Sequence, residues 1–315
     1  MQIKSWENSR VLVTGSSGFI GRHLISYLQK KKAKVLGLSR HPGDTTIESR
    51  VDVADKQAVL EIFQKFKPDA CFHLASDAIV EFGSKEPYQT FSNNIVSALN
   101  ILEASRICHI GRLIIASTSH VYGKASLPYH ENEPARPSRP YETSKTCVDL
   151  MAQSYADSYN LPVLIPRFVN IYGPGDTNIS RVIPKTIQSV VQGKNPTMWG
   201  GNAKREYLYI DDAIQAYNLL GQITDVQLEK NRIYNVGTGD PISVRELLLK
   251  IIALSSQKLS ITKIENGREE ELREQIVSSE KIKRVMKWAP QVNLDRGLSL
   301  TYEWYKTVHI NSEKS

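Results

Sequence analysis

The sequence predicts an α/β fold in which helices cover both faces of a doubly wound parallel sheet, and two observations support this. Short β-branched apolar runs alternate with longer amphipathic stretches through the first half of the chain. A glycine-rich segment stands directly between the first apolar run and the first amphipathic stretch. The expected strands are Val11 to Thr14, Lys34 to Leu38, Ala70 to Leu74, Arg112 to Ser117 and Val163 to Arg167. The expected helices are Phe19 to Lys31, Asp55 to Phe66, Pro87 to Ser105 and Tyr141 to Tyr159.

The second half of the chain is less regular. After Arg167 the alternation loosens, and turn signals follow at Gly173-Pro174-Gly175. We expect residues 1–172 to form the doubly wound domain, with a return segment at about 208–240 that brings the strand Arg232 to Val236 back to the sheet. Residues 173–207 and 241–310 would form a smaller α/β region at the carboxyl end, and residues 311–315 a frayed tail.

Composition narrows the function classes. The chain has 315 residues, of which 41% are hydrophobic and 23% are charged, so it can bury a full core. No apolar run approaches the roughly 18 residues of a membrane helix, and the first ten residues lack a signal-peptide core, so we expect no membrane association and a cytoplasmic location. The net charge of +7 is dispersed, which argues against nucleic-acid binding. Three cysteines without CxxC spacing indicate neither a disulfide framework nor a metal site.

The glycine-rich segment VLVTGSSGFIG spans Val11 to Gly21. In a Rossmann-type dinucleotide site, Gly15 permits the tight turn, Gly18 lets the backbone approach a pyrophosphate and Gly21 lets the helix pack on the strand. The helix N-terminus then faces the phosphates. The neighbouring Ser17, Phe19 and Ile20 are expected to line the same cofactor site.

The end of the second expected strand bears on the choice of cofactor. An acidic residue commonly binds the adenosine ribose about 20 residues after the glycine loop, but here Ser39 and Arg40 stand in that place. A serine and an arginine can hold a ribose 2′-phosphate by charge-assisted hydrogen bonds, so NADP is favoured over NAD. Alternatively, Arg40 lies flat on the adenine.

Tyr141 and Lys145 are separated by one helical turn and therefore emerge on one helix face. Pro140 suits the first turn of that helix, and Thr118 follows an apolar strand whose end faces the ligand site of a doubly wound fold. Oxidation of a secondary alcohol needs a base for the hydroxyl proton, and a phenol with a pKa near 10 is a weak one. A lysine one turn away would stabilise the phenolate by roughly 3 kcal/mol. The alternative is an exposed helix pair without catalytic meaning.

Seven motifs, in order, resemble the extended short-chain dehydrogenase/reductase family in its nucleotide-sugar epimerase and dehydratase branch. They read TGSSGFIG (14–21), FHLAS (72–76), STSHVYG (117–123), PYETSK (140–145), RFVNIYGPG (167–175), REYLYIDD (205–212) and YNVGTG (234–239). The resemblance implies Thr118, Tyr141 and Lys145 as catalytic residues, a nucleotide-diphosphate sugar as substrate, no metal, and a homodimer built through the helices Pro87 to Ser105 and Tyr141 to Tyr159. The implied cofactor contacts, besides Lys145 and the glycine loop, are Asp52, Val53, Leu74, Ala75, Ser76 and Asn94. The implied substrate contacts are Ser119, His120, Asn170, Arg205, Arg268 and Glu271.

Two departures from the family pattern affect the reaction that we expect. Relatives that eliminate water or decarboxylate a sugar acid resemble one another in a carboxylate just after the catalytic hydroxyl residue, whereas Thr118 is followed by Ser119 and His120. Glu206 stands where the family usually has aspartate, which we expect to be harmless.

The leading hypothesis is therefore a nucleotide-diphosphate-sugar epimerase that transiently oxidises a sugar hydroxyl through bound NAD(P). The alternatives are an NADPH-dependent reductase of a nucleotide 4-keto-6-deoxy sugar, a 4,6-dehydratase, and a non-catalytic NADP-binding regulatory protein. His120 is either a further acid or base or a polar loop residue.

Overall fold

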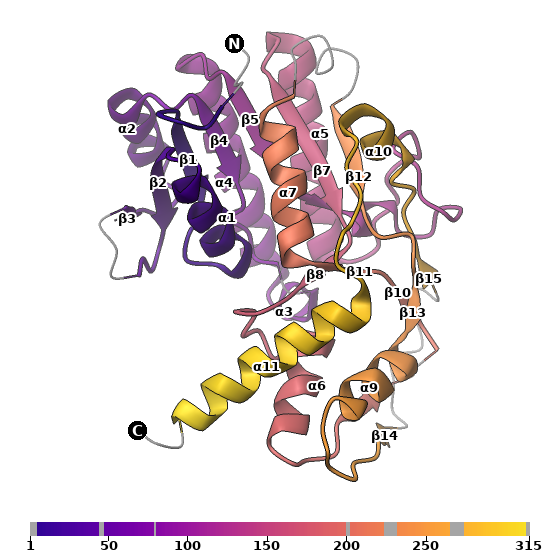
Figure 1. Ribbon diagram of the computed structural model, residues 1–315. Coiled ribbons are helices and arrows are strands. Elements are labelled where there is room, and N and C mark those ends of the chain that lie inside the picture. Colours follow the sequence, from indigo (N-terminus) through magenta and orange to yellow (C-terminus); the bar gives the residue numbers. More distant parts are fainter. Residues whose placement is uncertain are drawn as a thin grey trace.

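The computed structural model describes residues 5–43, 47–78, 80–199, 202–223, 232–264 and 274–312 (Figure 1). A parallel sheet with the strand order β12-β7-β5-β4-β1-β2-β3 forms its centre, and β6 also pairs with β7. The strands are β1 (Arg10–Thr14), β2 (Lys34–Ser39), β3 (Glu48–Arg50), β4 (Ala70–His73), β5 (Arg112–Ile115), β6 (Ser117–Thr118), β7 (Val163–Phe168), β8 (Asn170–Tyr172), β9 (Thr197–Trp199), β10 (Lys204–Arg205), β11 (Tyr207–Tyr209), β12 (Ile233–Val236), β13 (Ile242–Ser243), β14 (Thr262–Ile264) and β15 (Glu274–Gln275).

Helices flank this sheet and build the second lobe. They are α1 (Phe19–Lys30), α2 (Lys56–Phe66), α3 (Val80–Lys85), α4 (Pro87–Ile107), the 3₁₀ helix η1 (Ser119–Tyr122), α5 (Pro140–Tyr159), α6 (Val182–Val191), α7 (Ile210–Gly221), α9 (Val244–Ala253), α10 (Glu280–Met286) and α11 (Leu294–Ser312). Helices α1 and α7 lie together on one face of the sheet, and α2, α4 and α5 lie on the other.

The chain reverses its winding direction at β1. This strand pairs in parallel with β2 on one side and with β4 on the other, so that Val13 lies opposite both Gly37 and Phe72. The strand order confirms the predicted doubly wound, Rossmann-type sheet. Ligands in such sheets bind beyond the carboxyl ends of the strands at the reversal, between β1 and β4.

Alternation along the strands divides the core into two halves. Val11 and Val13 of β1 pack beneath α1 and α7, whereas Leu12 between them packs beneath α2 and α4. Both halves are fully buried, because a parallel sheet covered by helices on both faces leaves no strand face in water. This explains why the strands read as continuous apolar runs in the sequence.

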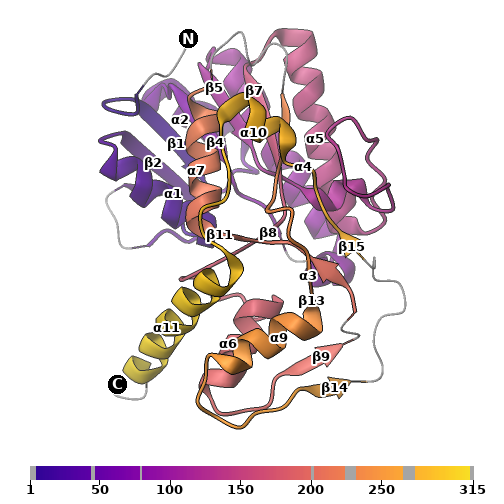
Figure 2. The same cartoon turned by 45° about the vertical axis from the view of Figure 1, so that its right-hand side comes forward.

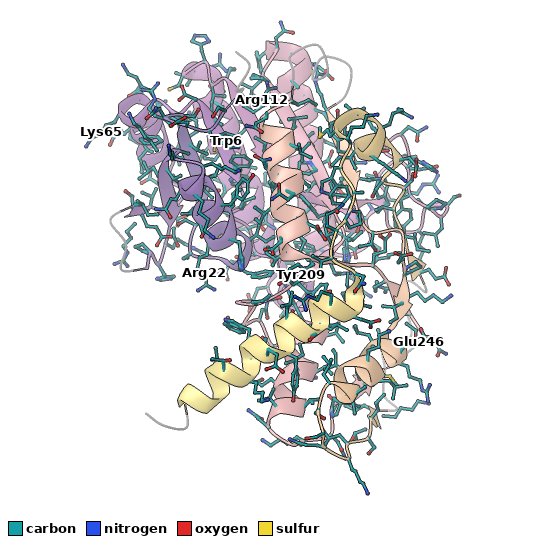
Figure 3. All side chains as sticks on the ribbon, in the orientation of Figure 1. Trp6, Arg22, Lys65, Arg112, Tyr209 and Glu246 are labelled. Carbon is teal, nitrogen blue, oxygen red and sulfur yellow. The ribbon has the colours of Figure 1, made fainter. Side chains whose placement is uncertain are left out.

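An aromatic contact closes α7 onto the sheet. The Trp6 ring lies 5.8 Å from the ring of Phe72 in β4, and its Nε1 donates a hydrogen bond of 2.8 Å to Asn218 of α7. Figure 3 places Trp6 between this helix and the strands. Trp6 therefore ties the start of the chain to a helix more than two hundred residues away.

The segment expected as one strand from Arg112 to Ser117 is two strands. β5 ends at Ile115, and the amide of Ala116 donates to the His73 carbonyl of β4. β5 already pairs with β7, and after Ala116 this pairing continues in the same register, with Ser117 opposite Arg167. Thr118 thereby lies at the carboxyl end of the sheet, at the start of η1.

The smaller lobe lies below the carboxyl ends of the strands (Figure 2). Helices α6, α9 and α11 pack on one another, β14 pairs in parallel with β9, and β10 pairs with β13 and β15. The later strand β12 pairs in parallel with β7, as the sequence predicted. Helix α11 continues to Ser312, two residues into the expected tail, and residues 313–315 lie outside the described residues. The exact domain bounds stay a prediction.

Candidate active site

The glycine loop has the close approaches that its sequence predicted. Gly15 has a φ of +68° and its amide donates to the Leu38 carbonyl at 2.9 Å. A Cβ on Gly15 would lie 2.9 Å from the Ala75 amide nitrogen, and one on Gly21 would lie 2.2 Å from the Gly15 carbonyl oxygen. No larger side chain fits either place, so the loop backbone stays open to a ligand.

Helix α1 begins at Phe19, directly after this loop. Gly18 caps it without a side-chain hydrogen bond, and its first turn contains no acidic residue. The amides of the first turn and the positive end of the helix dipole are therefore available to an anion. This arrangement fits the pyrophosphate of a dinucleotide, with Ser17 and Ile20 beside it in the sequence.

Ser39 and Arg40 lie beside the glycine loop, as predicted. The Ser39 hydroxyl oxygen is 2.6 Å from that of Ser17. The Arg40 guanidinium is 3.7 Å from the Asp77 carboxylate and about half exposed. A ribose phosphate at this point would meet one cation together with a nearby carboxylate.

Leu74, Ala75 and Asn94, which are also predicted to bind cofactor, take part in hydrogen bonds that hold the segment after the end of β4. The Thr14 hydroxyl oxygen accepts the amides of Leu74 and Ala75, each at 3.2 Å, which fixes the turn after β4. Asn94 is buried; its side-chain oxygen accepts the Asp77 amide at 2.7 Å, and its amide group donates to Ser144 of α5 at 2.9 Å. Asn94 thus holds the segment after Ser76 against α5.

Two more predicted contacts lie near the end of β3. The side chain of Val53 is buried in the core, and its carbonyl accepts a hydrogen bond from Asn100 of α4. The carboxylate of Asp52 accepts the Ala54 amide at 3.0 Å. The turn is therefore fixed by its own contacts and by α4.

The three predicted catalytic residues meet at the carboxyl end of the sheet. Tyr141 is the second residue of α5, Lys145 lies one turn later, and Thr118 ends β6. Each is less than a tenth exposed, and the side chains of Thr118 and Tyr141 are hydrogen-bonded. This geometry disfavours the alternative of an exposed helix pair.

The electrostatics of this group correct one expectation. Burial raises the pKa of the Tyr141 phenol, and the positive charge of Arg181 and the hydrogen bond with Thr118 oppose that rise without cancelling it. Burial also lowers the pKa of Lys145 to about 8, against the attraction of Asp149. The prediction that Lys145 brings the pKa of Tyr141 down is wrong for the protein alone: the groups that lower this pKa are Arg181 and Thr118, and burial outweighs them.

Arg181 is a site residue that the sequence analysis missed. It precedes α6 in the smaller lobe, and its guanidinium donates to the Asp176 carboxylate at 3.1 Å. Its charge reaches Tyr141 across the boundary between the lobes. Nothing in the sequence around Arg181 indicates that its charge acts on Tyr141.

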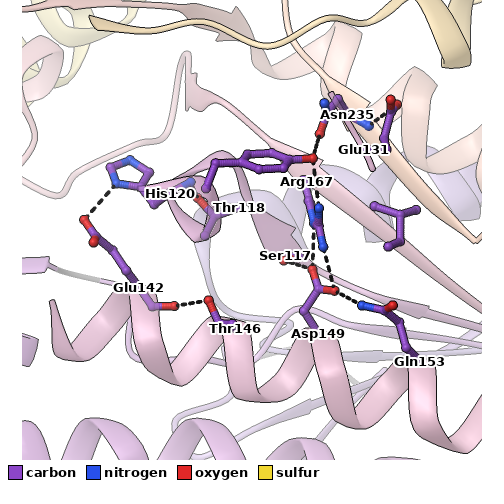
Figure 4. A network of polar contacts seen from close by, with 12 residues as sticks. Ser117, Thr118, His120, Glu131, Glu142, Thr146, Asp149, Gln153, Arg167 and Asn235 are labelled. Atoms are coloured by element: carbon purple, nitrogen blue, oxygen red, sulfur yellow. Dashed lines mark hydrogen bonds and ion pairs between the residues drawn. The ribbon is translucent and has the colours of Figure 1, made fainter. Parts of the chain in front are cut away.

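A buried polar network joins the catalytic helix to the sheet (Figure 4). The Arg167 guanidinium donates to Asp149 of α5 at 2.8 and 3.0 Å, and the Ser117 hydroxyl donates to the same carboxylate at 2.9 Å. Arg167 also donates to the Tyr122 hydroxyl, which donates in turn to Asn235 of β12. The network joins β6, β7, β12 and α5, and so fixes Lys145 one turn before Asp149.

A second pair, also drawn in Figure 4, adjoins the phenol. Nδ1 of His120 lies 3.6 Å from a carboxylate oxygen of Glu142, the residue after Tyr141. The rings of His120 and Tyr141 have centroids 6.4 Å apart in an edge-on arrangement. Ser119, predicted beside His120 as a substrate contact, is buried.

The predicted substrate residues Asn170 and Arg205 lie on short strands of two different small sheets. Asn170 of β8 donates to the Glu206 carbonyl at 3.1 Å, and Arg205 of β10 is buried. Glu206 has a defined role: its carboxylate accepts the amides of Val277 at 2.6 Å and Gly239 at 2.7 Å. Arg268 and Glu271, also predicted, lie outside the described residues.

Comparison with known proteins decides the family. Residues 11–237 match the model of the NAD dependent epimerase/dehydratase family. The chain belongs to this family. It is therefore an enzyme of the extended short-chain dehydrogenase/reductase type, and the predicted resemblance is confirmed.

Curated relatives of this epimerase/dehydratase chain have both activities in their names. A dTDP-D-glucose 4,6-dehydratase of Dictyostelium discoideum is 31% identical over 274 residues, which cover 78% of this chain and 62% of that relative. The chain thus spans less than two thirds of the length of that relative. A UDP-glucuronate 4-epimerase of Thermodesulfobacterium geofontis is 28% identical over 94% of this chain and 95% of its own.

Solved structures agree with the family assignment. The UDP-glucose 4-epimerase of Thermotoga maritima, solved with UDP-glucose, is 27% identical, with a TM-score of 0.86 over 95% of this chain and 99% of that one. The UDP-glucose 4-epimerase of Thermus thermophilus, solved with NAD, is 29% identical, with the same TM-score over 94% of this chain and 99% of that one.

Other features of this epimerase/dehydratase chain lie away from the proposed chemistry. A cavity of about 880 Å³, lined among others by Arg10, Asp69 and Gly111, lies at the opposite, amino ends of the strands.

Among the described residues, no group of three or more His, Cys, Asp or Glu side chains is placed to hold a metal ion. The described helices include none with the length and apolarity needed to cross a bilayer.

Proposed function

We propose that the chain is a nucleotide-diphosphate-sugar epimerase that transiently oxidises a sugar hydroxyl with bound NAD(P). The contact between Thr118 and Tyr141, with the buried Lys145 one turn away, supports this proposal most strongly. These side chains stand at the same end of the sheet as the glycine loop, where a doubly wound fold binds its ligands. The nicotinamide, when bound, accepts a hydride from the sugar and returns it.

Each protein group has a distinct task in this proposal. Tyr141 takes the proton of the sugar hydroxyl, and Thr118 hydrogen-bonds the same oxygen to orient it. Lys145 holds the ribose hydroxyls of the cofactor, and Arg181 supplies the positive charge that favours the phenolate. Burial raises the pKa of the phenol, so the phenolate is a stronger base than a free one but forms less readily, and the neutral phenol is the form that returns the proton.

A 4,6-dehydratase is the second candidate, favoured by the identity to the Dictyostelium discoideum enzyme. Against it stand Ser119 and His120, which occupy the place of the expected carboxylate after Thr118. The reductase and the non-catalytic regulatory protein remain hypotheses. The latter is disfavoured by the assembled catalytic group.

We further propose that NADP is preferred over NAD, because Ser39 and Arg40 adjoin the glycine loop where an acidic residue would exclude a phosphate. The Asp77 carboxylate beside Arg40 opposes this preference. Release of the bound nucleotide by denaturation and its identification by mass spectrometry decide between the two cofactors.

We also propose a homodimer through α4 and α5, in the cytoplasm. Both helices expose large apolar side chains, which a pair of helices turned toward a second copy would cover. These side chains are Tyr88, Val96, Leu99, Ile107, Leu150 and Tyr159.

One experiment separates the candidate reactions. The purified enzyme is incubated with UDP-, dTDP-, CDP- and GDP-hexoses, with NMR detection of the sugars and absorbance detection of reduced nicotinamide. Isomerised sugar without net change in the cofactor supports the epimerase. A 4-keto-6-deoxy product supports the dehydratase. Consumption of NADPH that occurs only with 4-keto sugars supports the reductase.

Tyr141→Phe should lower the turnover by about a hundredfold or more, because the phenol supplies the proton transfer. Tyr159→Phe, on an exposed part of the same helix, should leave it unchanged. An unaltered rate in the Tyr141→Phe variant would assign the chemistry elsewhere.

A further inference from the structure

The carboxylate of Glu142 is fixed more firmly than a helix cap requires. One of its oxygens accepts the amides of Ser138 and Arg139 at 3.1 and 3.2 Å and the Ser138 hydroxyl at 3.2 Å. Its side chain is only 4% exposed, whereas a capping glutamate commonly lies at the surface. The first oxygen thus accepts hydrogen bonds from the groups at the start of α5. The second oxygen is left for another partner.

That partner is His120. Its Nδ1 lies 3.6 Å from the second Glu142 oxygen and is itself buried, without a closer hydrogen-bond partner. The exposed fifth of this side chain therefore belongs to the remaining ring atoms. Burial raises the pKa of Glu142, but the nearby His120 and the Ser138 amide outweigh it and hold the pKa below its usual range. An ionised carboxylate at Nδ1 favours a proton on that nitrogen and leaves Nε2 for chemistry.

The pair opens onto the same site as the phenol. The backbone amide of His120 donates to the Thr118 hydroxyl at 3.3 Å, and Thr118 is hydrogen-bonded to Tyr141. The edge of the imidazole faces the phenol ring, with 6.4 Å between the ring centroids. Two groups able to transfer protons therefore stand side by side, whereas removal and return of a hydride at one carbon need only one.

We propose that His120, positioned by Glu142, is a second acid and base that moves a proton at the carbon next to the transient ketone. The inference rests on the proposed function, because that carbon becomes acidic only after the neighbouring hydroxyl has been oxidised. The C–H bond breaks, its electron pair forms the C=C bond of an enolate, and the carbonyl π pair moves onto oxygen. The proton passes to Nε2 of His120, the sugar ring turns over in the site, and return of the proton to the other face inverts that carbon without consuming an oxidant.

The same enolate allows a second outcome. Where the next carbon bears a hydroxyl, the electron pair expels it as the protonated His120 gives up its proton, so that water leaves. The substrate class implied is a nucleotide sugar that undergoes chemistry at two neighbouring carbons, not at the oxidised carbon alone.

The test uses the whole enzyme in deuterium oxide with UDP-, dTDP-, CDP- and GDP-glucose. We expect the wild-type product to contain deuterium at the carbon next to the oxidised one, detected by NMR. In His120→Gln the incorporation should fall about a hundredfold or more, while reduced nicotinamide still forms on the enzyme. His130→Gln, an exposed histidine near the site, should behave as wild type.

Each result bears on a separate claim. A converted sugar without deuterium, or incorporation by His120→Gln at the wild-type rate, overturns the role of His120 and leaves the epimerase intact. Absence of any sugar oxidation, equally in wild type and Tyr141→Phe, overturns the proposed function and this inference with it.

A measurement without substrate tests Glu142. In protein labelled with ¹⁵N-histidine, the His120 signals should show a proton on Nδ1, and the isosteric Glu142→Gln should redistribute it between the two nitrogens. A His120 tautomer that is unchanged by this substitution removes the positioning role of Glu142.

Discussion

Asp149 and Arg167 form an ion pair that is almost completely buried, with the guanidinium donating to both carboxylate oxygens at 2.8 and 3.0 Å. Ser117 and Gln153 add hydrogen bonds to the same carboxylate. Both carboxylate oxygens of Asp149 thereby accept two hydrogen bonds each. A buried charge is tolerated when it is paired and hydrogen-bonded in this way.

Asp149→Asn should lower the free energy of unfolding by about 3–5 kcal/mol, because Arg167 would remain buried without its counterion. Urea unfolding measures the loss. Asp295→Asn removes an exposed pair with Lys250 and should cost less than about 1 kcal/mol. Equal losses in the two variants would contradict the importance of burial.

Lys145→Met should stabilise the protein freed of cofactor while abolishing turnover. Burial lowers the pKa of Lys145 to about 8 from its ordinary value of about 10.4, so the charged form is disfavoured in the folded state by about 3 kcal/mol. That cost is fully present below pH 8 and disappears as the pH rises to the unfolded-state value.

The stability advantage of Lys145→Met should therefore shrink between about pH 8 and pH 10.4, measured by urea unfolding across this range. Lys283→Met, an exposed lysine on α10, serves as the control and should show no such dependence. A constant advantage across the range would mean that the ammonium is not penalised by burial.

Gly15→Ala should both strain the loop and weaken cofactor binding. Gly15 and Gly239 have positive φ values, +68° and +80°, so alanine at either costs about 1 kcal/mol of stability. Only at Gly15 does the added methyl meet backbone atoms, those of Leu74 and Ala75. Calorimetric titration with NAD and NADP should show weaker binding in Gly15→Ala and unchanged binding in Gly239→Ala.

Leu150→Glu should convert the proposed dimer to monomers, because it places a charge in the apolar surface of α5. Light scattering gives the mass in solution. Leu249→Glu, at an exposed leucine on the separate helix α9, should leave the dimer intact. A monomeric wild-type protein would refute the proposed interface.

The local signals that predicted the sheet and the catalytic group share one property. Each signal depends on constraints within a few residues of the chain. The signals are the glycines Gly15 and Gly21, the one-turn spacing of Tyr141 and Lys145, and the apolar strands. The interruption at Ala116 could not be foreseen, because it depends on where the pairing with β4 ends, at Ile115 opposite His73.

The missed parts of the site depend on contacts between distant segments. Arg181 acts on Tyr141 from the other lobe, and Asp149 meets Arg167 from a different element. Their charges read as ordinary surface residues in the sequence, and only burial makes them important. The pKa of Tyr141 was misjudged for the same reason, since the sequence shows the neighbouring cation but not the desolvation.

Glu206, expected to be a harmless replacement for aspartate, fastens three segments at the junction of the lobes through the amides of Gly239 and Val277. An outward rigid-body rotation of the smaller lobe would break both hydrogen bonds and leave the buried carboxylate of Glu206 without donors. A hinge motion at this point would therefore cost free energy. We expect preference for another sugar to arise from substitution of side chains around the site, while the contact between the lobes stays the same.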